Sequence, residues 1–357
     1  MNKSTLLVTG GCGFIGSNLC VLLKEKYPHY TIMALDNLKR RGSELNIPRL
    51  QERGVKYVHG DIRNPGDLKI EEPLDYIIDA AAEPSVGSGL EGAFNYVINT
   101  NLNGTVNVLE LAARHKARFI FLSTSRVYPI SYLENIGYTE CDARFSIHET
   151  QSVKGISKEG VNEDFPLDRA RSVYGSTKLA SELMIEEFRE FFGVDYVINR
   201  CGVVAGPYQM GKVDQGVIAL WMARYYWKKD VSYFGYNGRG KQVRDVLHIQ
   251  DLFALIDHEI HYFDRVQGRT FNVGGGNASS VSLKELSAIC SAITGNRVKE
   301  NAIQENRKGD IPIYITDNAR VTTSTGWTPV RTVTNIAQDI FTWINSNEKT
   351  LQNILNI

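Results

Sequence analysis

Tyr174 and Lys178 are the residues whose types and spacing most directly suggest catalysis, and they stand four residues apart in the segment SVYGSTK. On a helix, positions i and i+4 share a face, so the lysine ammonium would lie beside the tyrosine phenol. A phenol has a pKa of about 10 in water. A neighbouring positive charge favours the phenolate, and the tyrosine can then accept a proton near neutral pH. Because this spacing is common by chance, the pair needs support from other residues.

Three hydroxyl residues and an arginine, at positions 123–126, follow the apolar run RFIFL. The apolar run predicts a buried strand that stops where the hydroxyls begin. Polar side chains at the end of a buried strand strengthen the prediction that Tyr174 and Lys178 belong to a catalytic site.

A glycine-rich loop near the start of the chain, VTGGCGFIG, places Gly10, Gly13 and Gly16 between a predicted strand and a predicted helix. Glycines there let the backbone turn tightly and approach a pyrophosphate, whose charge the helix N-terminus favours. Asp36 ends the second predicted strand, where a carboxylate can hydrogen-bond a ribose diol. The loop and the acid together predict a dinucleotide site.

The choice between NAD and NADP depends on the charges that follow the second strand. The Asp36 carboxylate would repel a 2′-phosphate, which favours NAD. The basic residues at 39–41 keep NADP as the alternative. Asp61 and Ile62 fall where a third strand should end and suit the edge of an adenine, although Asp61 could equally cap the next turn.

Alternating strand-like and helix-like segments must position these residues over the first two hundred positions. Unbroken apolar strands between helices indicate a parallel sheet that is covered on both faces. We therefore predict an α/β fold, a doubly wound parallel sheet of the Rossmann type. The predicted strands are 5–10, 30–37, 56–62, 75–82, 118–125 and 195–207, and the predicted helices are 14–27, 95–115 and 174–193.

The alternation ends after about residue 203, and the remaining segments predict a smaller, mixed C-terminal domain. Its predicted helices are 282–295 and 335–355. We expect an NAD-binding Rossmann domain over 1–202, with a contribution from about 241–275, and a smaller substrate-binding domain over 203–357.

A polar, charged segment lies between Tyr128 and Tyr174, and its middle covers residues 138–165. Loops of this length are usually functional or disordered. Its position after the hydroxyl cluster leads us to predict an active-site flap.

The composition argues against several other classes of protein. Forty basic residues balance forty acidic ones, whereas a nucleic-acid-binding protein normally carries a basic excess. No run approaches the ~20 apolar residues that span a bilayer, and the N-terminus does not read as a signal peptide. Five cysteines without a CxxC pair predict reduced thiols in a cytoplasmic protein. His258 and His261, with Glu259 between them, are expected on a solvated helix surface, and no metal site is predicted.

The glycine triplet, Thr124, Tyr174 and Lys178 together resemble the extended short-chain dehydrogenase/reductase family, which contains nucleotide-sugar epimerases and dehydratases. The likeness covers nearly the whole chain and includes the segments NLNGT, GKQVRDVLHIQDL and NRKGDIPIYITDNAR. The resemblance implies that Thr124, Tyr174 and Lys178 form a catalytic triad, in which Thr124 hydrogen-bonds the sugar hydroxyl that loses its proton.

The resemblance also implies contacts with the cofactor NAD and with a nucleotide-sugar substrate. The expected cofactor contacts are Gly10, Gly13, Phe14, Ile15, Gly16, Asp36, Asn37, Asp61, Ile62, Ala80, Ala81, Ala82, Asn101, Ser123, Tyr174, Lys178 and Val203. The expected substrate contacts are Thr124, Arg126, Gln215, Arg244 and Arg307. Arg244 and Arg307 are expected on the diphosphate, because guanidinium binds phosphate in a bidentate manner.

The residues after Thr124 bear on the reaction. The family's 4,6-dehydratases have an Asp-Glu pair there, which water elimination uses, but this chain has Ser125 and Arg126. Arginine stays charged and cannot act as that acid, so the 4,6-dehydratase reading is disfavoured. The segments STSRVY, DQG and GKQVRDVLH most resemble the CDP-paratose 2-epimerases, a subgroup that inverts C2 of a CDP-3,6-dideoxyhexose. Pro129 departs from the glycine that is common after VY.

Other functions stay open at this point. A UDP-sugar 4-epimerase is the main alternative, followed by a nucleotide-sugar decarboxylase, in which Arg126 would bind a carboxylate, or a reductase. A non-catalytic NAD-sensing protein is a more remote alternative, because Thr124, Tyr174 and Lys178 are all present. By analogy with the family, a homodimer or homotetramer is expected.

Overall fold

The computed structural model of the protein describes residues 3–85, 87, 92–211 and 216–355. The chain divides into two compact units, each assembled from separate stretches of sequence. The first unit takes Met1–Val127, Ser172–Arg200 and Phe253–Phe271, and the second takes Tyr128–Arg171, Cys201–Leu252 and Asn272–Ile357. Each unit is described by itself below.

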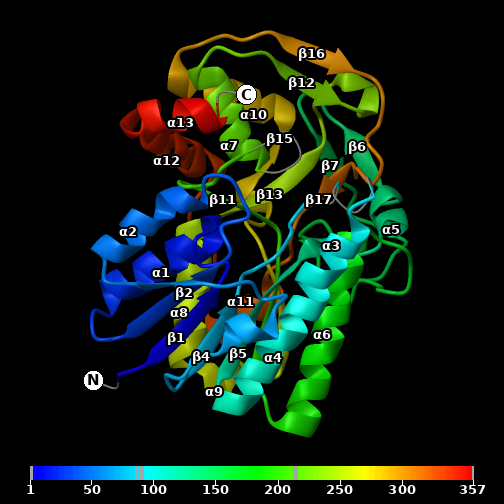
Figure 1. Ribbon diagram of the computed structural model, residues 1–357. Helices are drawn as coiled ribbons and strands as arrows, with labels where there is room; N and C mark the ends of the chain where they lie inside the picture. Colours follow the sequence, from blue (N-terminus) through cyan, green and yellow to red (C-terminus); the bar gives the residue numbers. More distant parts are fainter. Residues whose placement is uncertain (1–2, 86, 88–91, 212–215, 356–357) are drawn as a thin grey trace. The chain divides into compact units, whose positions relative to one another are not determined.

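A seven-stranded sheet carries the first unit, with the strand order β14-β10-β5-β4-β1-β2-β3. Its strands β1, β2, β4 and β5 are labelled in Figure 1. The pairs from β3 to β5 are parallel. The strands are β1 Thr5–Thr9, β2 Thr31–Asp36, β3 Lys56–His59, β4 Tyr76–Asp79, β5 Arg118–Thr124, β10 Tyr196–Cys201 and β14 Arg269–Val273. The order reverses between β1 and β4, which is the place where ligands bind in doubly wound sheets. The predicted α/β fold class is confirmed.

Helices cover both faces of this sheet. They are α1 Phe14–Lys26, α2 Asn46–Glu52, α3 Phe94–Ile98, α4 Gly104–His115, α6 Val173–Phe192, α8 Ile249–His261 and α9 Phe263–Val266. On one face, α4 and α6 pack with strand residues such as Ile77 and Phe121 into one apolar core. On the other face, α1 and α8 are joined by an ion pair between Lys26 and Asp257 at 2.7 Å.

The long helix expected over 95–115 is interrupted. Its first part is α3, its second part is α4, and Asn99–Asn103 form a π-helical turn between them. Gly104 follows this turn, where a Cβ would lie 2.6 Å from the Ile62 side chain. The glycine therefore lets the helix approach the loop after β3, a long-range packing effect that helical periodicity does not reveal.

The single strand expected over 195–207 is also wrong, because it is two strands. β10 ends at Cys201, and β11, Val203–Ala205, belongs to a different sheet. Gly202 stands between them, and its N–H donates to the carbonyl of Val273 at 2.8 Å. An added Cβ at Gly202 would meet Thr316 and Asp245 at 3.2 and 3.3 Å, so the break is fixed by tertiary packing.

Small mixed sheets build the second unit, as predicted for the C-terminal part. Strand β13 pairs with β11 and β17 in parallel and with β15 antiparallel, and β6-β7, β8-β9 and β12-β16 form separate pairs. The strands are β6 Tyr138–Glu140, β7 Phe145–Ile147, β8 Ile156–Ser157, β9 Gly160–Val161, β11, β12 Val231–Phe234, β13 Val243–His248, β15 Ser280–Ser282, β16 Glu300–Ile303 and β17 Ile313–Tyr314.

Three helices, α7, α10 and α12, pack into one apolar core of the second unit. Its helices are α5 Ile130–Glu134, α7 Val217–Tyr226, α10 Leu283–Thr294, α11 Ala319–Thr325, α12 Val333–Ser346 and α13 Glu348–Leu355. The C-terminal helix expected over 335–355 is therefore two helices, α12 and α13. Capping boxes open α10 at Ser282 and α12 at Thr332, which satisfies backbone N–H groups at both N-termini.

The segment between Tyr128 and Tyr174 is folded onto the second unit. Val161 N–H donates to the Ile315 carbonyl at 2.8 Å, and Asp317 N–H donates to the Val161 carbonyl at 3.0 Å. Tyr128 donates to Asn272 at 2.7 Å, and the Asn272 amide donates to the Val161 carbonyl at 2.9 Å. A catalytic role for the segment remains a prediction.

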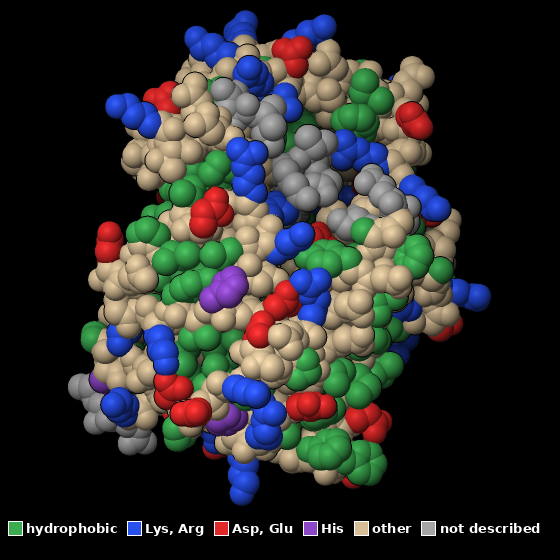
Figure 2. Space-filling view, viewed as in Figure 1, with side chains coloured by type: hydrophobic (Ala, Val, Ile, Leu, Met, Phe, Trp, Pro, Cys, Tyr) green, Lys and Arg blue, Asp and Glu red, His purple; other side chains and the backbone are tan. Residues whose placement is uncertain are grey.

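Charges of both signs are interspersed over the face of the molecule seen in Figure 2, in keeping with the balanced composition. None of the helices within the described ranges is both long enough and apolar enough to cross a bilayer. His258 and His261 flank Glu259, which is fully buried rather than solvated as expected. Among the described residues, no His, Cys, Asp and Glu side chains gather into a group that could hold a metal ion.

Candidate active site

The N-terminal turn of α6 carries Tyr174 and Lys178. Ser172 caps this helix, because its hydroxyl accepts the N–H of Gly175 at 3.1 Å. Tyr174 is half-buried and Lys178 is only 2% exposed. The Lys178 Nζ lies 3.8 Å from the centre of the Phe121 ring on β5. The helix therefore holds the ammonium against the sheet, one turn after the phenol.

The end of β5 carries the hydroxyl cluster beside the same helix. Ser123 donates to Glu182 Oε1 at 2.5 Å, and Glu182 lies one turn beyond Lys178 on α6. This bond fixes the end of β5 to α6. The neighbouring Thr124 is buried, and its oxygen accepts the N–H of Arg126 at 3.2 Å, which leaves the hydroxyl hydrogen to be offered to another group. The chain thus brings the end of β5 and the start of α6 into one region of the first unit.

The backbone around the glycine loop leaves no room for larger side chains. A loop of this kind, whose glycines carry no side chains, can approach a pyrophosphate closely. Gly10 has φ of 62°, and a Cβ there would lie 2.9 Å from the Ala80 carbonyl oxygen. A Cβ on Gly16 would lie 2.2 Å from the Gly10 carbonyl oxygen. Gly13 caps α1 without a side-chain hydrogen bond, and the first turn has no acidic residue. The backbone N–H groups of that turn can therefore bind a phosphate.

Asp36 lies at the end of β2 and faces the same loop. Its Oδ2 accepts the Cys12 N–H at 3.0 Å, and its Oδ1 accepts the Leu38 N–H at 2.7 Å. Burial raises the pKa of this carboxyl, while the backbone N–H groups oppose the rise. A carboxylate offers about four lone pairs, so Asp36 can accept ribose hydroxyls as well as these two N–H groups. The residues present fit a dinucleotide.

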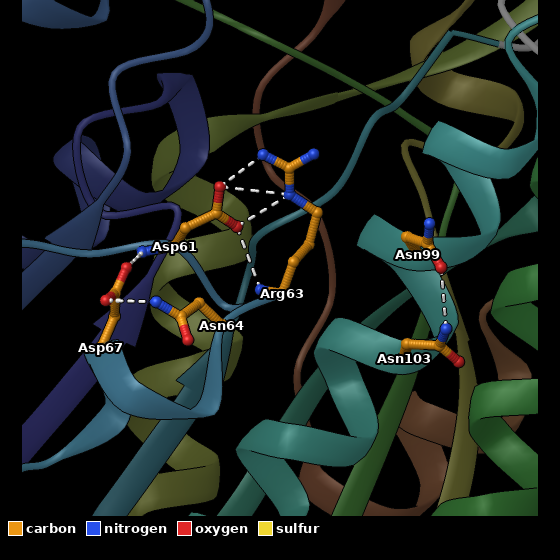
Figure 3. Close-up of a pocket in the computed structure, with 6 residues that line it drawn as sticks. All are labelled: Asp61, Arg63, Asn64, Asp67, Asn99 and Asn103. Carbon is orange, nitrogen blue, oxygen red and sulfur yellow. Dashed lines mark hydrogen bonds and ion pairs between the residues drawn. The ribbon is translucent and has the colours of Figure 1, made fainter.

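A hollow of about 570 Å³ opens beside Asp61, at the expected adenine end (Figure 3). Arg63 donates to Asp61 from Nε at 2.9 Å and holds the pKa of that carboxyl well below its usual range. Asn37 donates to Asp61 Oδ2 at 3.0 Å. The Arg63 guanidinium lies 5.1 Å from the centre of the Tyr96 ring. Arg63 and Asn37 thus hold the Asp61 carboxylate in place. The sequence alone did not identify Arg63 or Tyr96 as residues of the site.

The loop after β4 contains Ala80, Ala81 and Ala82, and Asn101 holds its end. Asn101 accepts the Glu83 N–H at 2.8 Å and donates to the Glu83 carbonyl at 3.1 Å. The π-helical turn of α3–α4 supplies this asparagine. The oxygen and the nitrogen of the Asn101 side-chain amide both already hydrogen-bond the loop. A direct contact of Asn101 with the cofactor therefore remains a prediction.

Other expected cofactor contacts lie on these same elements. Phe14 and Ile15 begin α1, and both are partly exposed. Ile62 is buried, and its carbonyl accepts the Asn107 amide at 2.8 Å. Val203 belongs to β11 in the second unit, opposite Val246 of β13.

The expected diphosphate contacts belong to the second unit. Arg244, on β13, donates to Asp310 Oδ1 at 2.9 Å and to the Ile311 carbonyl at 2.7 Å. Arg307 lies with its guanidinium 3.9 Å from the centre of the Phe234 ring. Gln215 lies outside the described residues. Arg244 is therefore held by a neighbouring acid, and Phe234 supports Arg307.

Sequence reasoning missed two groups of buried charge near Lys178. One is the Glu182–Arg200 pair, whose carboxylate also accepts from Ser123. The other is Asp79 at the end of β4, which is fully buried. The sequence signal for Asp79 is an acidic residue at the end of an apolar strand, in the segment YIID.

Comparison with known proteins gives consistent matches. The model of the NAD dependent epimerase/dehydratase family matches residues 6–274. CDP-paratose 2-epimerase from Salmonella typhi is 28% identical over 350 residues, covering 96% of this chain and 99% of that protein. dTDP-glucose 4,6-dehydratase from Mycolicibacterium smegmatis is 28% identical over 347 residues, covering 96% and 94%.

The fold agrees with solved structures. The crystal structure of UDP-glucuronic acid 4-epimerase from Bacillus cereus, in complex with UDP-glucuronic acid and NAD, matches with a TM-score of 0.78. It is 23% identical and covers 96% of this chain and 99% of that one. NAD is the cofactor of the matched family, and the glycine loop and Asp36 fit it. Since the family model spans well over half of the sequence, the chain is an enzyme of the NAD-dependent epimerase/dehydratase family, among the extended short-chain dehydrogenases/reductases.

Proposed function

We propose that this enzyme is a nucleotide-sugar epimerase that inverts C2 of a CDP-3,6-dideoxyhexose, converting CDP-paratose to CDP-tyvelose. The observation that carries the proposal is the placing of Tyr174 and Lys178 on the first turns of α6, beside the β5 end that carries Thr124. The choice of sugar is supported by the near full-length similarity to a CDP-paratose 2-epimerase.

Tyr174 acts as the base in this mechanism. The Lys178 ammonium, one turn along the helix, favours the phenolate form of Tyr174. Thr124 hydrogen-bonds the sugar hydroxyl and orients it, so that its proton passes to the phenolate oxygen. When bound, NAD supplies the group that accepts a hydride from C2 and returns it. Tyr174 gives the proton back once the sugar presents its other face, so substrate and product differ only in configuration.

Arg244 and Arg307 are the proposed diphosphate contacts. Arg244 and Arg307 carry the positive charge and the forked N–H donors that suit phosphate oxygens. The ion pair with Asp310 orients Arg244, and the ring of Phe234 orients Arg307.

The residues after Thr124 argue against dehydration, although a dTDP-glucose 4,6-dehydratase is also 28% identical. Elimination of water needs an acid and a base of its own beside the sugar. Ser125 and Arg126 occupy the two positions, and an arginine cannot donate its proton at accessible pH. An epimerase needs neither group, because Tyr174 serves both half-reactions.

A UDP-sugar 4-epimerase is the second candidate, because the UDP-glucuronic acid 4-epimerase has the same fold. The chemistry at Tyr174 would be the same, and only the carbon that faces NAD would differ. The two candidates therefore separate by substrate and not by catalytic residues.

The purified enzyme tests the proposal when it is given CDP-paratose without added NAD. We expect CDP-tyvelose to accumulate until the two sugars reach equilibrium, with no net consumption of a coenzyme, as measured by chromatography of the nucleotide sugars. UDP-glucose, UDP-galactose and UDP-glucuronic acid serve as parallel substrates. Turnover of one of these, with none of CDP-paratose, would replace the 2-epimerase proposal with a 4-epimerase.

A further inference from the structure

Asp79 is a buried acid that the proposed mechanism leaves without a role. It closes β4 and is fully buried. In the parallel sheet it lies opposite Thr9 of β1 and Phe121 of β5. Residues opposite one another in adjacent strands project to the same face of a sheet. The Asp79 carboxyl and the Phe121 ring are therefore neighbours on the face that α4 and α6 cover.

Hydroxyl groups hold the Asp79 carboxyl in place. Thr9 donates to its Oδ1 at 2.5 Å, and the Thr105 hydroxyl on α4 lies 2.9 Å from its Oδ2. The Thr9 oxygen in turn accepts the Ala81 N–H at 3.2 Å. A buried carboxyl with donors on both oxygens has a fixed orientation, and here the two donors come from β1 and α4.

The Lys178 ammonium lies on the same face, against the strand neighbour of Asp79. Its Nζ is 3.8 Å from the centre of the Phe121 ring, and Phe121 is the strand neighbour of Asp79. Burial raises the pKa of Asp79, and the charge of Lys178 is the main factor that opposes the rise. A buried ammonium loses its hydration and needs a nearby negative charge to remain protonated. Asp79 is placed to supply that charge.

Glu182, another described acid near Lys178, is already engaged. Glu182 lies one turn further along α6, and its carboxylate is paired with Arg200 of β10 at 2.7 Å and with the Ser123 hydroxyl. Tyr174 lies one turn before Lys178 and carries the group that the ammonium is to influence. The Glu182 charge is thus largely balanced by Arg200.

We propose that Asp79 is a positioning residue that keeps Lys178 charged and pressed against β5, so that Lys178 can hold Tyr174 in its reactive phenolate form. This inference rests on the proposed catalytic roles of Tyr174 and Lys178. It adds a residue that touches neither the sugar nor the reacting atoms, and that acts only through the lysine.

The direct test is the titration of Tyr174 in wild type and in Asp79→Asn. The asparagine keeps the shape of the side chain and removes its charge. Ultraviolet difference spectra between each protein and its Tyr174→Phe counterpart isolate the Tyr174 phenolate. We expect Asp79→Asn to move this titration to higher pH by about one unit, which is a factor of about ten in phenolate at a fixed pH below it.

The direction in which the Tyr174 titration shifts shows whether Asp79 acts through Lys178 or directly on Tyr174. If Asp79 acted on Tyr174 directly, removal of its negative charge would move the titration to lower pH, because like charges disfavour one another. An unchanged or lowered titration would overturn the inference. Asp75→Asn is the matched control, since Asp75 precedes the other end of β4 and binds the Thr5 N–H. We expect it to leave the titration unchanged.

A double-mutant cycle on folding provides a second measurement that needs no activity. Lys178→Met leaves the Asp79 charge buried without its partner and should lower the unfolding midpoint. We expect this loss to be smaller when Lys178→Met is made in the Asp79→Asn variant than in wild type. Additive losses would contradict the pairing.

The proposed function and the proposed role of Asp79 can be refuted independently of each other. Neither measurement uses a sugar nucleotide, so an enzyme that did not epimerise CDP-paratose could still show the shift and the coupling. Conversely, full CDP-paratose turnover with no shift and no coupling would retain the proposed function and remove the role of Asp79.

Discussion

Tyr174 is reactive in this account because of the residues packed beneath it. Lys178 lies on the same face of α6 and is almost fully buried against Phe121. Burial excludes water, which strengthens the electrostatic effect of the ammonium on the phenol. Burying that ammonium costs free energy, and in our proposal Asp79, on the same face of the sheet as Phe121, offsets this cost as the counter-charge.

Tyr174→Phe removes the base and keeps the ring. We expect the turnover rate to fall by about 10²–10⁴-fold, the usual contribution of a positioned acid or base, while NAD remains bound to the purified protein. Steady-state kinetics and the NAD content after denaturation give both values. Turnover equal to that of wild type would show that another group accepts the proton.

At the scale of single elements, the sheet and the helices around the site could be predicted from the sequence. The apolar runs that end in Thr9, Asp36 and Thr124 are strands, and the YxxxK segment is the first turn of α6. Helical and strand periodicity carries this information locally. The glycine loop was equally readable, because the spacing of Gly10, Gly13 and Gly16 is local, and an added Cβ on Gly16 would clash with the loop's own backbone.

What the sequence did not reveal depends on contacts between distant segments. Gly202, at the break between β10 and β11, packs closely on Thr316 and Asp245, and the π-helical turn before Gly104 is accompanied by close packing on Ile62. The burial of Glu259 could not be read from its position between two histidines, because its neighbour Asn199 comes from β10. Periodicity does not report such long-range packing.

The Glu182–Arg200 pair joins α6 to β10 in the interior of the first unit. Arg200 donates to the carboxylate at 2.7 to 3.2 Å, and both side chains are almost fully buried. Arg200→Met leaves Glu182 as an uncompensated buried charge, and we expect it to lower the free energy of unfolding by about 3–5 kcal/mol. Urea denaturation measures the change.

The control for this prediction removes both charges. Arg200→Met combined with Glu182→Leu should recover much of the lost stability, because no buried charge is then left unpaired. A double variant as unstable as the sum of its single variants would mean that the loss came from packing and not from charge.

At the scale of the whole molecule, stability should depend on pH through Glu259. Burial raises the pKa of Glu259 to about 8, against an ordinary value of 4.5. Asn199 donates to Glu259 Oε2 at 3.0 Å. Within the described residues, Glu259 Oε1 and Asn199 Oδ1 have no hydrogen-bond partner. A proton on Glu259 would let these two atoms share a second bond, so we expect the folded enzyme to hold this carboxyl in its neutral form.

Such a raised pKa destabilises the fold as the pH rises. The unfolded chain ionises Glu259 above about 4.5 and the folded chain only above about 8, so stability falls between these values and is then constant. We expect Glu259→Gln, which can make both bonds without ionising, to lose on the order of a few kcal/mol less stability across this range. Denaturation curves at several pH values test this, and parallel pH profiles for both proteins would contradict it.

In the proposed function, a hydride leaves a carbon of the sugar and returns to it. The balanced charge, the family match over residues 6–274 and the near full-length similarity to a CDP-paratose 2-epimerase all fit a small-molecule isomerase. The central claim is that C2 is oxidised and then reduced again without loss of its hydrogen to water.

The most direct test of that claim is the reaction of CDP-paratose that carries deuterium at C2. We expect the CDP-tyvelose formed to retain deuterium at C2, without exchange into the solvent, when the product is analysed by mass spectrometry and NMR. Loss of the C2 deuterium to water would contradict it, because the proton would then have been removed from carbon and replaced from solvent.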